Sequence, residues 1–119
     1  MLNEIRDVRQ VPGEPRRRWF ADEFFDLIVW LDTGGTVTGF QLCYDKRADE
    51  RAVTWRRESG WAHERVDAGE IPGRAKMTPI LVPDGVFDRT GIATRFRREA
   101  RGIDGPIADL VYEKLLEYP

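Results

Sequence analysis

The stretch FDLIVWLDTGGTVTGFQLCY, from Phe25 to Tyr44, predicts a β-hairpin at the centre of the fold. Its turn is Thr33-Gly34-Gly35-Thr36, a two-residue Gly-Gly turn, because glycines adopt the positive φ angles that the favoured hairpin turns require. With Thr33 opposite Thr36, alternate residues give one apolar face and one half-polar face. The expected apolar pairs are Phe25 with Tyr44, Leu27 with Leu42, Val29 with Phe40 and Leu31 with Thr38. The expected half-polar pairs are Asp26 with Cys43, Ile28 with Gln41, and Trp30 with Gly39, where the Trp30 ring covers the glycine.

Extended chain is also predicted on the N-terminal side of this hairpin. Trp19–Asp32 is rich in aromatic and β-branched residues and has no helical periodicity, which indicates a long strand with an interruption near Asp22-Glu23. Val11-Pro12-Gly13-Glu14 fits a type II turn, since Pro sets the second φ angle and Gly permits a positive third one. Ile5–Gln10 is then expected to form a short edge strand.

Three further strands are predicted after the hairpin. Ala52–Arg57 is expected to continue the apolar face, and Trp61–Asp67 follows as the next antiparallel strand. A polar loop, Ala68–Pro79, leads to the short buried strand Ile80–Val82. The expected pairs between the hairpin and Ala52–Arg57 are Phe40 with Trp55 and Leu42 with Val53.

Helical periodicity replaces the two-residue alternation towards the C-terminus. Asp88 suits the N-cap of a first helix, and Asp104, followed by Pro106, suits the start of a second. Apolar residues recur at helical spacing in both, as Ile92, Phe96, Ala100 and Ile103, and then as Ile107, Leu110, Val111, Leu115 and Tyr118. The predicted fold is a single α+β domain over residues 1–119: an antiparallel β-meander of four to five strands packed on one face by two C-terminal helices.

Composition limits the classes of protein to which the chain can belong. Its 119 residues are 41% hydrophobic and 34% charged, which is typical of a folded domain and not of a disordered chain. A net charge of −2 argues against a general nucleic-acid binder. No apolar run approaches the roughly 20 residues that span a bilayer, and the charged start MLNEIRDVRQ lacks a signal-peptide pattern. We therefore expect a cytoplasmic protein without a membrane or nucleic-acid partner.

The single cysteine and the few metal-ligand side chains argue against a metal centre. Cys43 has no second cysteine to pair with, and its predicted place opposite Asp26 puts a carboxylate beside the thiol, which disfavours the reactive thiolate. His63, Glu64 and Asp67 offer one imidazole and two carboxylates, but neighbouring strand residues point to opposite faces. We predict no metal site, no cofactor and no catalytic residue among these groups.

The stretch TWRRESGWAHER, residues 54–65, holds two tryptophans, three arginines and the only histidine. A three-residue loop, Glu58-Ser59-Gly60, places Trp55 opposite His63, so that the histidine lies at the edge of the apolar face. A two-residue loop would place His63 opposite Arg56 on the other face. The glycine at the third loop position favours the first register.

The predicted binding residues are Trp30, Arg56, Trp61 and His63. Trp30 and Arg56 are expected to lie close together on the half-polar face, in a cation–π arrangement that suits a planar or anionic ligand. The commoner alternative is a surface pair that only shields the sheet. Phe20, Phe24 and Ile28 are expected on the same face, away from the helices, which predicts a homodimer formed through it.

The stretch VWLDTG, Val29–Gly34, resembles the apolar-apolar-Asp-Thr-Gly signature of the aspartic proteases. The resemblance covers six residues and implies a dimer of the retroviral type, in which two copies of Asp32 share a proton and activate water. Gly35 follows where those proteases commonly have Ala or Ser, and Pro83 follows the last predicted strand where they have Gly. The alternative is that Asp32 closes a tight hairpin turn.

The predicted function is a small, soluble, non-catalytic binding or regulatory module of bacterial type, homo-oligomeric, with a small molecule or a protein as its ligand. A hydrolase is the first alternative, using the paired Asp32 site or His63 as a general base with Asp67 or Glu58. A phosphate or nucleic-acid binder is the second alternative. Its arginines would be Arg95, Arg97, Arg98 and Arg101, which a solvated helix face explains equally well.

Overall fold

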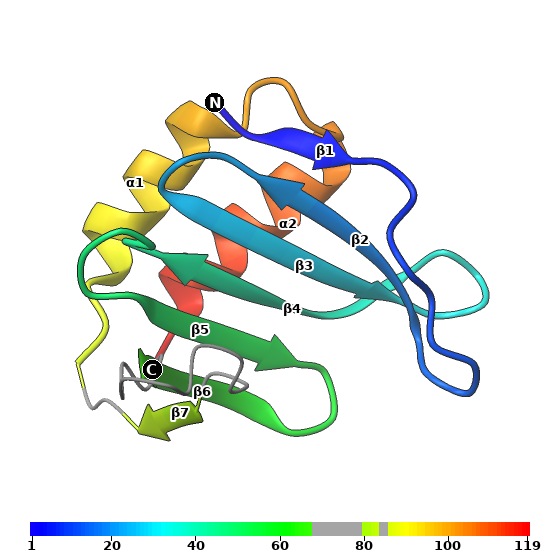
Figure 1. Ribbon diagram of the computed structural model, residues 1–119, viewed down its shortest axis with the longest axis horizontal. Helices are drawn as coiled ribbons and strands as arrows, with labels where there is room; N and C mark the ends of the chain where they lie inside the picture. The colour runs from blue at the N-terminus through cyan, green and yellow to red at the C-terminus, as the bar shows by residue number, and fades with distance from the viewer. Residues whose placement is uncertain (68–79, 84–85) are drawn as a thin grey trace, which may run out of the picture.

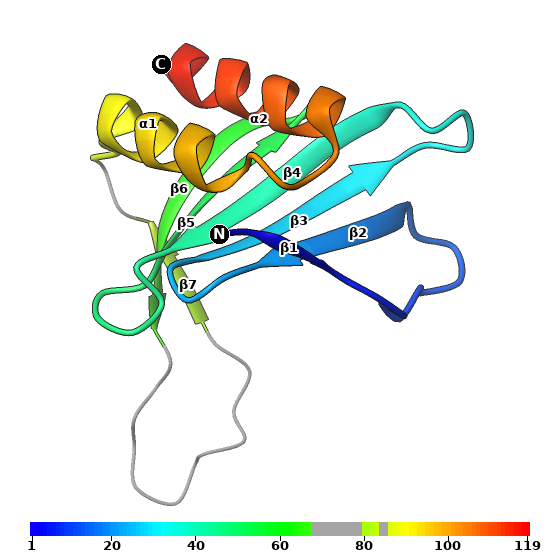
Figure 2. The same cartoon turned by 90° about the horizontal axis from the view of Figure 1, so that it is seen from above.

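The computed structural model describes residues 1–67, 80–83 and 86–119. Its seven strands form one antiparallel sheet in the order of the sequence, and both helices lie against one face of the sheet (Figure 1, Figure 2). The strands are β1 (Asn3–Ile5), β2 (Arg16–Ala21), β3 (Phe25–Leu31), β4 (Val37–Tyr44), β5 (Arg51–Arg56), β6 (Gly60–Asp67) and β7 (Ile80–Pro83), and the helices are α1 (Arg89–Glu99) and α2 (Gly105–Glu117). The predicted α+β class and antiparallel meander are confirmed, and the predicted number of strands is wrong.

The run Trp19–Asp32 forms two strands rather than one. Asp22 Oδ1 accepts hydrogen bonds from the backbone N–H groups two and three residues further on, at 2.8 and 2.7 Å, and so closes a tight turn. The expected interruption is therefore a complete reversal of the chain, and β2 pairs with β3 with Phe20 opposite Leu27. Phe20 is consequently buried on the helix side and Phe24 packs against the same core, so their predicted position on the other face is wrong.

The central hairpin has the predicted register but a different turn. The pairs Phe25 with Tyr44, Asp26 with Cys43, Leu27 with Leu42, Ile28 with Gln41, Val29 with Phe40 and Trp30 with Gly39 are all present. The turn has three residues instead of two, since Asp32 N–H donates to Thr36 O at 2.9 Å and Gly35 takes a φ of +82°. Leu31 pairs with Val37 rather than Thr38, and the register shifts by one residue between Trp30 and Leu31, which offsets the longer turn.

The pairing of β5 with β4 was predicted correctly, whereas its pairing with β6 was not. Both predicted pairs with β4 are present. Against β6, however, Trp55 lies opposite Trp61 instead of His63, because the loop is residues 57–59 and Gly60, at φ +85°, begins the next strand. The observed register differs by two residues from the predicted pairing of Trp55 with His63. Because side chains alternate between faces with a period of two, each side chain keeps its predicted face, and His63 lies on the helix side.

The N-terminal edge strand lies at Asn3–Ile5 and not at the predicted Ile5–Gln10. The side chain of Gln10 takes the place of a strand beside β2: its Nε2 donates to Arg17 O at 2.9 Å, and its Oε1 accepts from Arg17 N at 3.0 Å. The predicted type II turn is present, with Glu14 N–H donating to Val11 O at 3.1 Å and Gly13 at φ +84°.

Both helices begin at their predicted caps. Asp88 accepts a hydrogen bond from Gly91 N–H, and Asp104 accepts one from Ile107 N–H. α1 ends at Glu99, so Ile103 lies in the connection to α2. The side chains that fill the space between helices and sheet include Phe25, Leu27, Val29, Phe40, Leu42, Phe96, Val111 and Leu115. In the described part of the chain, neither helix is long and apolar enough to cross a membrane. The predicted loop Ala68–Pro79 lies outside the described residues.

Candidate binding face of the sheet

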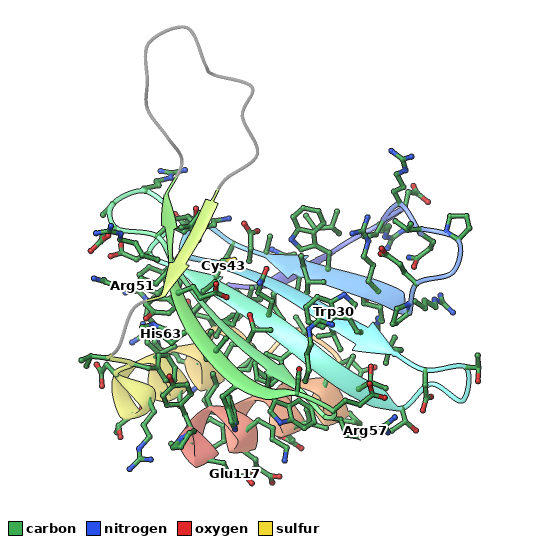
Figure 3. The ribbon with its side chains drawn as sticks, turned by 90° about the horizontal axis from the view of Figure 1, so that it is seen from below. Trp30, Cys43, Arg51, Arg57, His63 and Glu117 are labelled. Atoms are coloured by element: carbon green, nitrogen blue, oxygen red, sulfur yellow. The ribbon has the colours of Figure 1, made fainter. Side chains whose placement is uncertain are left out.

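The face of the sheet away from the helices, which we name the open face, is built from alternate residues of β2 to β6. Because the strands are in register, the residues of this face form three rows across the sheet. The basic row is Arg17, Trp30, Gly39, Arg56 and Gly60; the middle row is Trp19, Ile28, Gln41, Thr54 and Ala62; the acidic row is Ala21, Asp26, Cys43, Ala52 and Glu64. Figure 3 shows Trp30 and Cys43 on this side of the sheet and the helices on the other.

Trp30 is held in one orientation within the basic row. The guanidinium carbon of Arg56 lies 4.0 Å from the centroid of its ring, so the predicted cation–π pair is present. The ring also covers Gly39, as predicted: a Cβ on Gly39 would lie 3.3 Å from Trp30 Cε3 and 2.6 Å from Trp55 O. Trp30 itself is half-buried, so part of an aromatic ring with a cation against it is exposed to solvent.

Asp26 is the residue of the acidic row with the most polar contacts to its neighbours. Its carboxylate accepts hydrogen bonds from Trp19 Nε1 at 3.3 Å and from Lys46 Nζ at 3.2 Å. Burial raises the pKa of the nearby Glu50 carboxyl, and the charge of Asp26 raises it further. Burial likewise raises the pKa of Cys43 to about 12, with smaller contributions from Glu50 and Asp26. The thiolate is disfavoured as predicted, although burial rather than Asp26 is the main cause.

The other two predicted binding residues, Trp61 and His63, lie on the helix-covered face. His63 Nε2 is 2.6 Å from the hydroxyl oxygen of Tyr44, and the two rings are stacked with centroids 6.0 Å apart. Phe87 and Tyr118 enclose the imidazole further, with ring centroids 5.1 and 6.3 Å from it. His63 is only 5% exposed. The four predicted binding residues therefore form two pairs on opposite faces of the sheet and not one site.

Asp32 is engaged in closing the turn between β3 and β4. Its Oδ1 accepts hydrogen bonds from the backbone N–H groups of Gly34 and Thr36, both at 2.9 Å. Asp is common in this position because its short side chain reaches the backbone of the turn. The turn-closing interpretation of the VWLDTG stretch thus accounts for the residue without any catalytic role.

The arginines of α1 contact side chains of the chain itself. Arg97 forms an ion pair with Asp109 at 2.6 Å, and the guanidinium of Arg95 lies 3.5 Å from the centroid of Phe24. These contacts hold α1 against α2 and against the β2–β3 turn. Arg98 lies 3.9 Å from the carboxylate of Glu99, so three of the four arginines that were candidates for phosphate contacts have partners within the chain. The fourth, Arg101, lies beyond the end of α1.

An open groove of about 930 Å³ lies at the end of the sheet, beside the basic row. The charged residues that line it are Glu14, Arg16, Asp32, Arg56, Arg57 and Glu58. Acidic and basic groups are equal in number, so the groove has no net charge to attract an anion. Among residues 1–67, 80–83 and 86–119, no group of three or more His, Cys, Asp and Glu is arranged to hold a metal ion.

Arg17 and Trp19 belong to the open face and were missed in the sequence. Both lie on β2, whose pairing with β3 depends on the turn at Asp22. A signal for this turn was present, since Asp readily begins a turn by accepting backbone hydrogen bonds. The aromatic residues on both sides of Asp22 outweighed that signal and favoured a continuous strand.

Comparison of the chain with protein-family models, with curated proteins and with solved structures finds no match. The function is therefore inferred from the geometry of the molecule.

Proposed function

We propose that the protein is a small non-catalytic binding module, cytoplasmic and of bacterial type, that binds a protein partner through the open face of its sheet. The observation that carries this proposal is the stack of Arg56 on the half-buried Trp30. The few residues that provide most of the binding energy at protein interfaces are enriched in Trp, Tyr and Arg. A ring that is already fixed loses little conformational entropy when a partner covers it.

The shape of the open face favours a protein over a small molecule. Trp19 and Ile28 in the middle row are half-buried, and Gln41 Nε2 donates to Thr54 Oγ1 at 3.1 Å beside them. The grooves at the sheet end and at the N-terminal edge reach this face at Arg56 and Arg17, and the middle row lies outside their linings. Small ligands need concave sites that enclose most of their surface, whereas a broad face with aromatic side chains suits another protein.

The side chains with the greatest catalytic potential have other roles, which supports a non-catalytic function. Asp32 caps a turn, and His63 is buried against Tyr44. Burial raises the pKa of Cys43 to about 12, so its reactive thiolate is even scarcer at neutral pH than that of an ordinary thiol. A hydrolase needs a base or a nucleophile that reaches its substrate.

A photoreactive phenylalanine analogue at position 28, in the middle row, tests this proposal in cells that express the chain. Irradiation is expected to give one dominant adduct with a protein, and Trp30→Ala in the same chain is expected to remove it. The matched control carries the analogue at position 113, where Glu113 is exposed on α2. Equal labelling from both positions, or no adduct from position 28, would contradict the proposal.

A further inference from the structure

We infer that the partner is a second copy of this chain, packed face to face with the first about a two-fold axis that runs along the middle row. The inference rests on the proposed function, because it names the partner of the same surface. In a two-fold dimer the same patch of each copy contacts the other, so the patch must be complementary to itself. The open face meets this requirement in its charges and in the sizes of its side chains.

The charges of the open face are separated into two rows. Arg17 and Arg56 lie in the basic row, and Asp26 and Glu64 lie in the acidic row, with uncharged residues between them. The two rows are four residues apart along each strand. At about 3.4 Å per residue, this places them roughly 14 Å apart. That separation is too long for ion pairs between the two rows within one copy.

Charge selects the direction of the two-fold axis. An axis parallel to the strands would place the basic row of one copy against the basic row of the other. An axis across the strands, over the middle row, turns the basic row of each copy onto the acidic row of its partner. Like charges placed opposite each other are destabilising, so the second direction is favoured. The two sheets then stack with their strands nearly aligned, which is one of the two usual arrangements of packed sheets.

The sizes of the opposing side chains agree with the same axis. On β2, Arg17 of one copy lies over Ala21 of the second, and on β5 Arg56 lies over Ala52. On β6 the order is reversed, because a glycine, Gly60, lies in the basic row. Each long arginine side chain therefore meets a small residue on the other copy.

Opposite charges are neighbours across this interface. Arg17 of one copy lies one strand from Asp26 of the second, and Arg56 lies one strand from Glu64 of the second. Neighbouring strands are about 4.8 Å apart, which an arginine side chain spans easily. Because the axis repeats each contact, the dimer holds two ion pairs of each kind. The pair between Arg56 and Glu64 is the stronger of the two, because Asp26 already pairs with Lys46 at 3.2 Å and Arg17 Nε already donates to Arg9 O at 2.8 Å.

The extent of the open face sets the expected strength of the dimer. Five strands and three rows cover about 24 Å by 20 Å at the usual spacings, or roughly 480 Å² in projection. Because protruding side chains add to this projected area, the accessible surface buried by the dimer falls at the small end of the range for specific interfaces. We therefore expect a dimer that dissociates at micromolar rather than nanomolar concentration.

Charge reversal tests both the partner and the axis. Arg56→Glu places acidic groups opposite each other in a homodimer, and Glu64→Arg places basic groups there. Each variant alone is expected to raise the dimer dissociation constant at least about tenfold. An equimolar mixture of the two variants restores an opposite-charge pair at both symmetric contacts, so a heterodimer about as stable as the wild-type dimer is expected. Sedimentation equilibrium measures these constants, with Arg98→Glu on the exposed side of α1 as the control for net charge.

Three results would overturn the inference: a wild-type chain that stays monomeric up to about 1 mM, an Arg56→Glu variant that dimerises like wild type, or a mixture no tighter than its components. Recovery in the mixture also shows that both variants are folded. A monomeric purified chain whose position 28 still crosslinks to a different protein in cells removes the second copy as partner and leaves the proposed binding function standing.

Discussion

The two faces of the sheet are made by the same strands, yet different interactions hold them. On the helix-covered face, Phe25, Leu27 and Val29 of β3 are fully buried. On the open face, the intervening residues of that strand, Asp26, Ile28 and Trp30, are half-buried and contact charged and aromatic neighbours. Alternation along one strand thus separates the fully buried core residues from half-buried residues that stay partly exposed to solvent.

This difference predicts which substitutions affect stability and which affect association. Apolar burial is the dominant favourable term in folding, and the covered face provides most of it. Cation–π and hydrogen-bond contacts at half-buried sites contribute less. Truncation of large side chains on the covered face should therefore lower the free energy of unfolding most, and truncation of half-buried or exposed side chains on the open face should lower it by about 1 kcal/mol or less.

Phe40→Ala should give the largest loss of stability. Phe40 is fully buried, with ring centroids 6.1 Å from Trp55 and 6.4 Å from Trp61. Removal of its ring should lower the free energy of unfolding by about 3–5 kcal/mol. The matched variant on the open face is Ile28→Ala, which should cost about 1 kcal/mol because the side chain is half-buried. Equal losses in urea denaturation would show that the open face is covered as fully as the other.

Cys43 is an exception on the open face, because its thiol behaves as a buried group. Its pKa of about 12 means that alkylation by iodoacetamide at pH 8 should be at least about a hundredfold slower in the folded protein than in urea. Well below pH 9 the thiol is almost entirely protonated in both states. As the pH rises from 9 towards 12 only the unfolded thiol ionises, so stability relative to Cys43→Ala should fall over that range. Equal alkylation rates in both states would disprove this assignment.

Gly39→Ala should be the most costly of the small substitutions on the open face. The added Cβ would lie 2.6 Å from Trp55 O, a backbone atom that cannot move without distorting β5. We expect a loss of about 1–3 kcal/mol in the free energy of unfolding. Gly34→Ala is the control, since its Cβ would meet Asp32 Oδ1 at an ordinary 3.4 Å. A similar midpoint of denaturation for both variants would argue against close contact between β4 and β5 at Gly39.

Tyr44→Phe probes the buried polar contact of the covered face. The change removes the hydroxyl that lies 2.6 Å from His63 Nε2 and keeps the aromatic ring. Loss of a hydrogen bond between buried groups should lower the free energy of unfolding by about 1–2 kcal/mol. The double variant with His63→Phe separates this contact from ring packing, because the two substitutions should then be non-additive. Additive losses would show that the two groups act independently.

The register of the sheet was predictable where turn chemistry and residue pairing agreed. Phe25 to Trp30 take their predicted partners on β4 even though the turn is one residue longer than expected. The apolar alternation explains this result, since a one-residue slip would move every buried side chain to solvent. The shift beside Leu31 absorbs the extra turn residue and keeps the buried pairs together.

The features of the candidate site that could not be predicted depend on contacts between segments that are distant in the sequence. Phe87 and Tyr118 enclose His63, but the packing of the C-terminal helix over β6 is not encoded in a local pattern. Trp30 and Arg56 were found because strand register alone brings them together. The position of Trp19 on the open face was missed, because it depends on whether the chain turns between β2 and β3, and a single side chain, Asp22, closes that turn.

Arg56→Ala should have the smallest effect on stability among the variants of the open face. Arg56 is exposed, and its contact with Trp30 should contribute about 0.5–1 kcal/mol to the free energy of unfolding. Arg57→Ala, at the exposed next position, should leave stability unchanged within error. In a chain whose other tryptophans are replaced by phenylalanine, acrylamide quenching of Trp30 should increase in Arg56→Ala and not in Arg57→Ala. If quenching is unchanged, Arg56 does not fix the ring, and the open face loses the preorganised aromatic on which its proposed binding role depends.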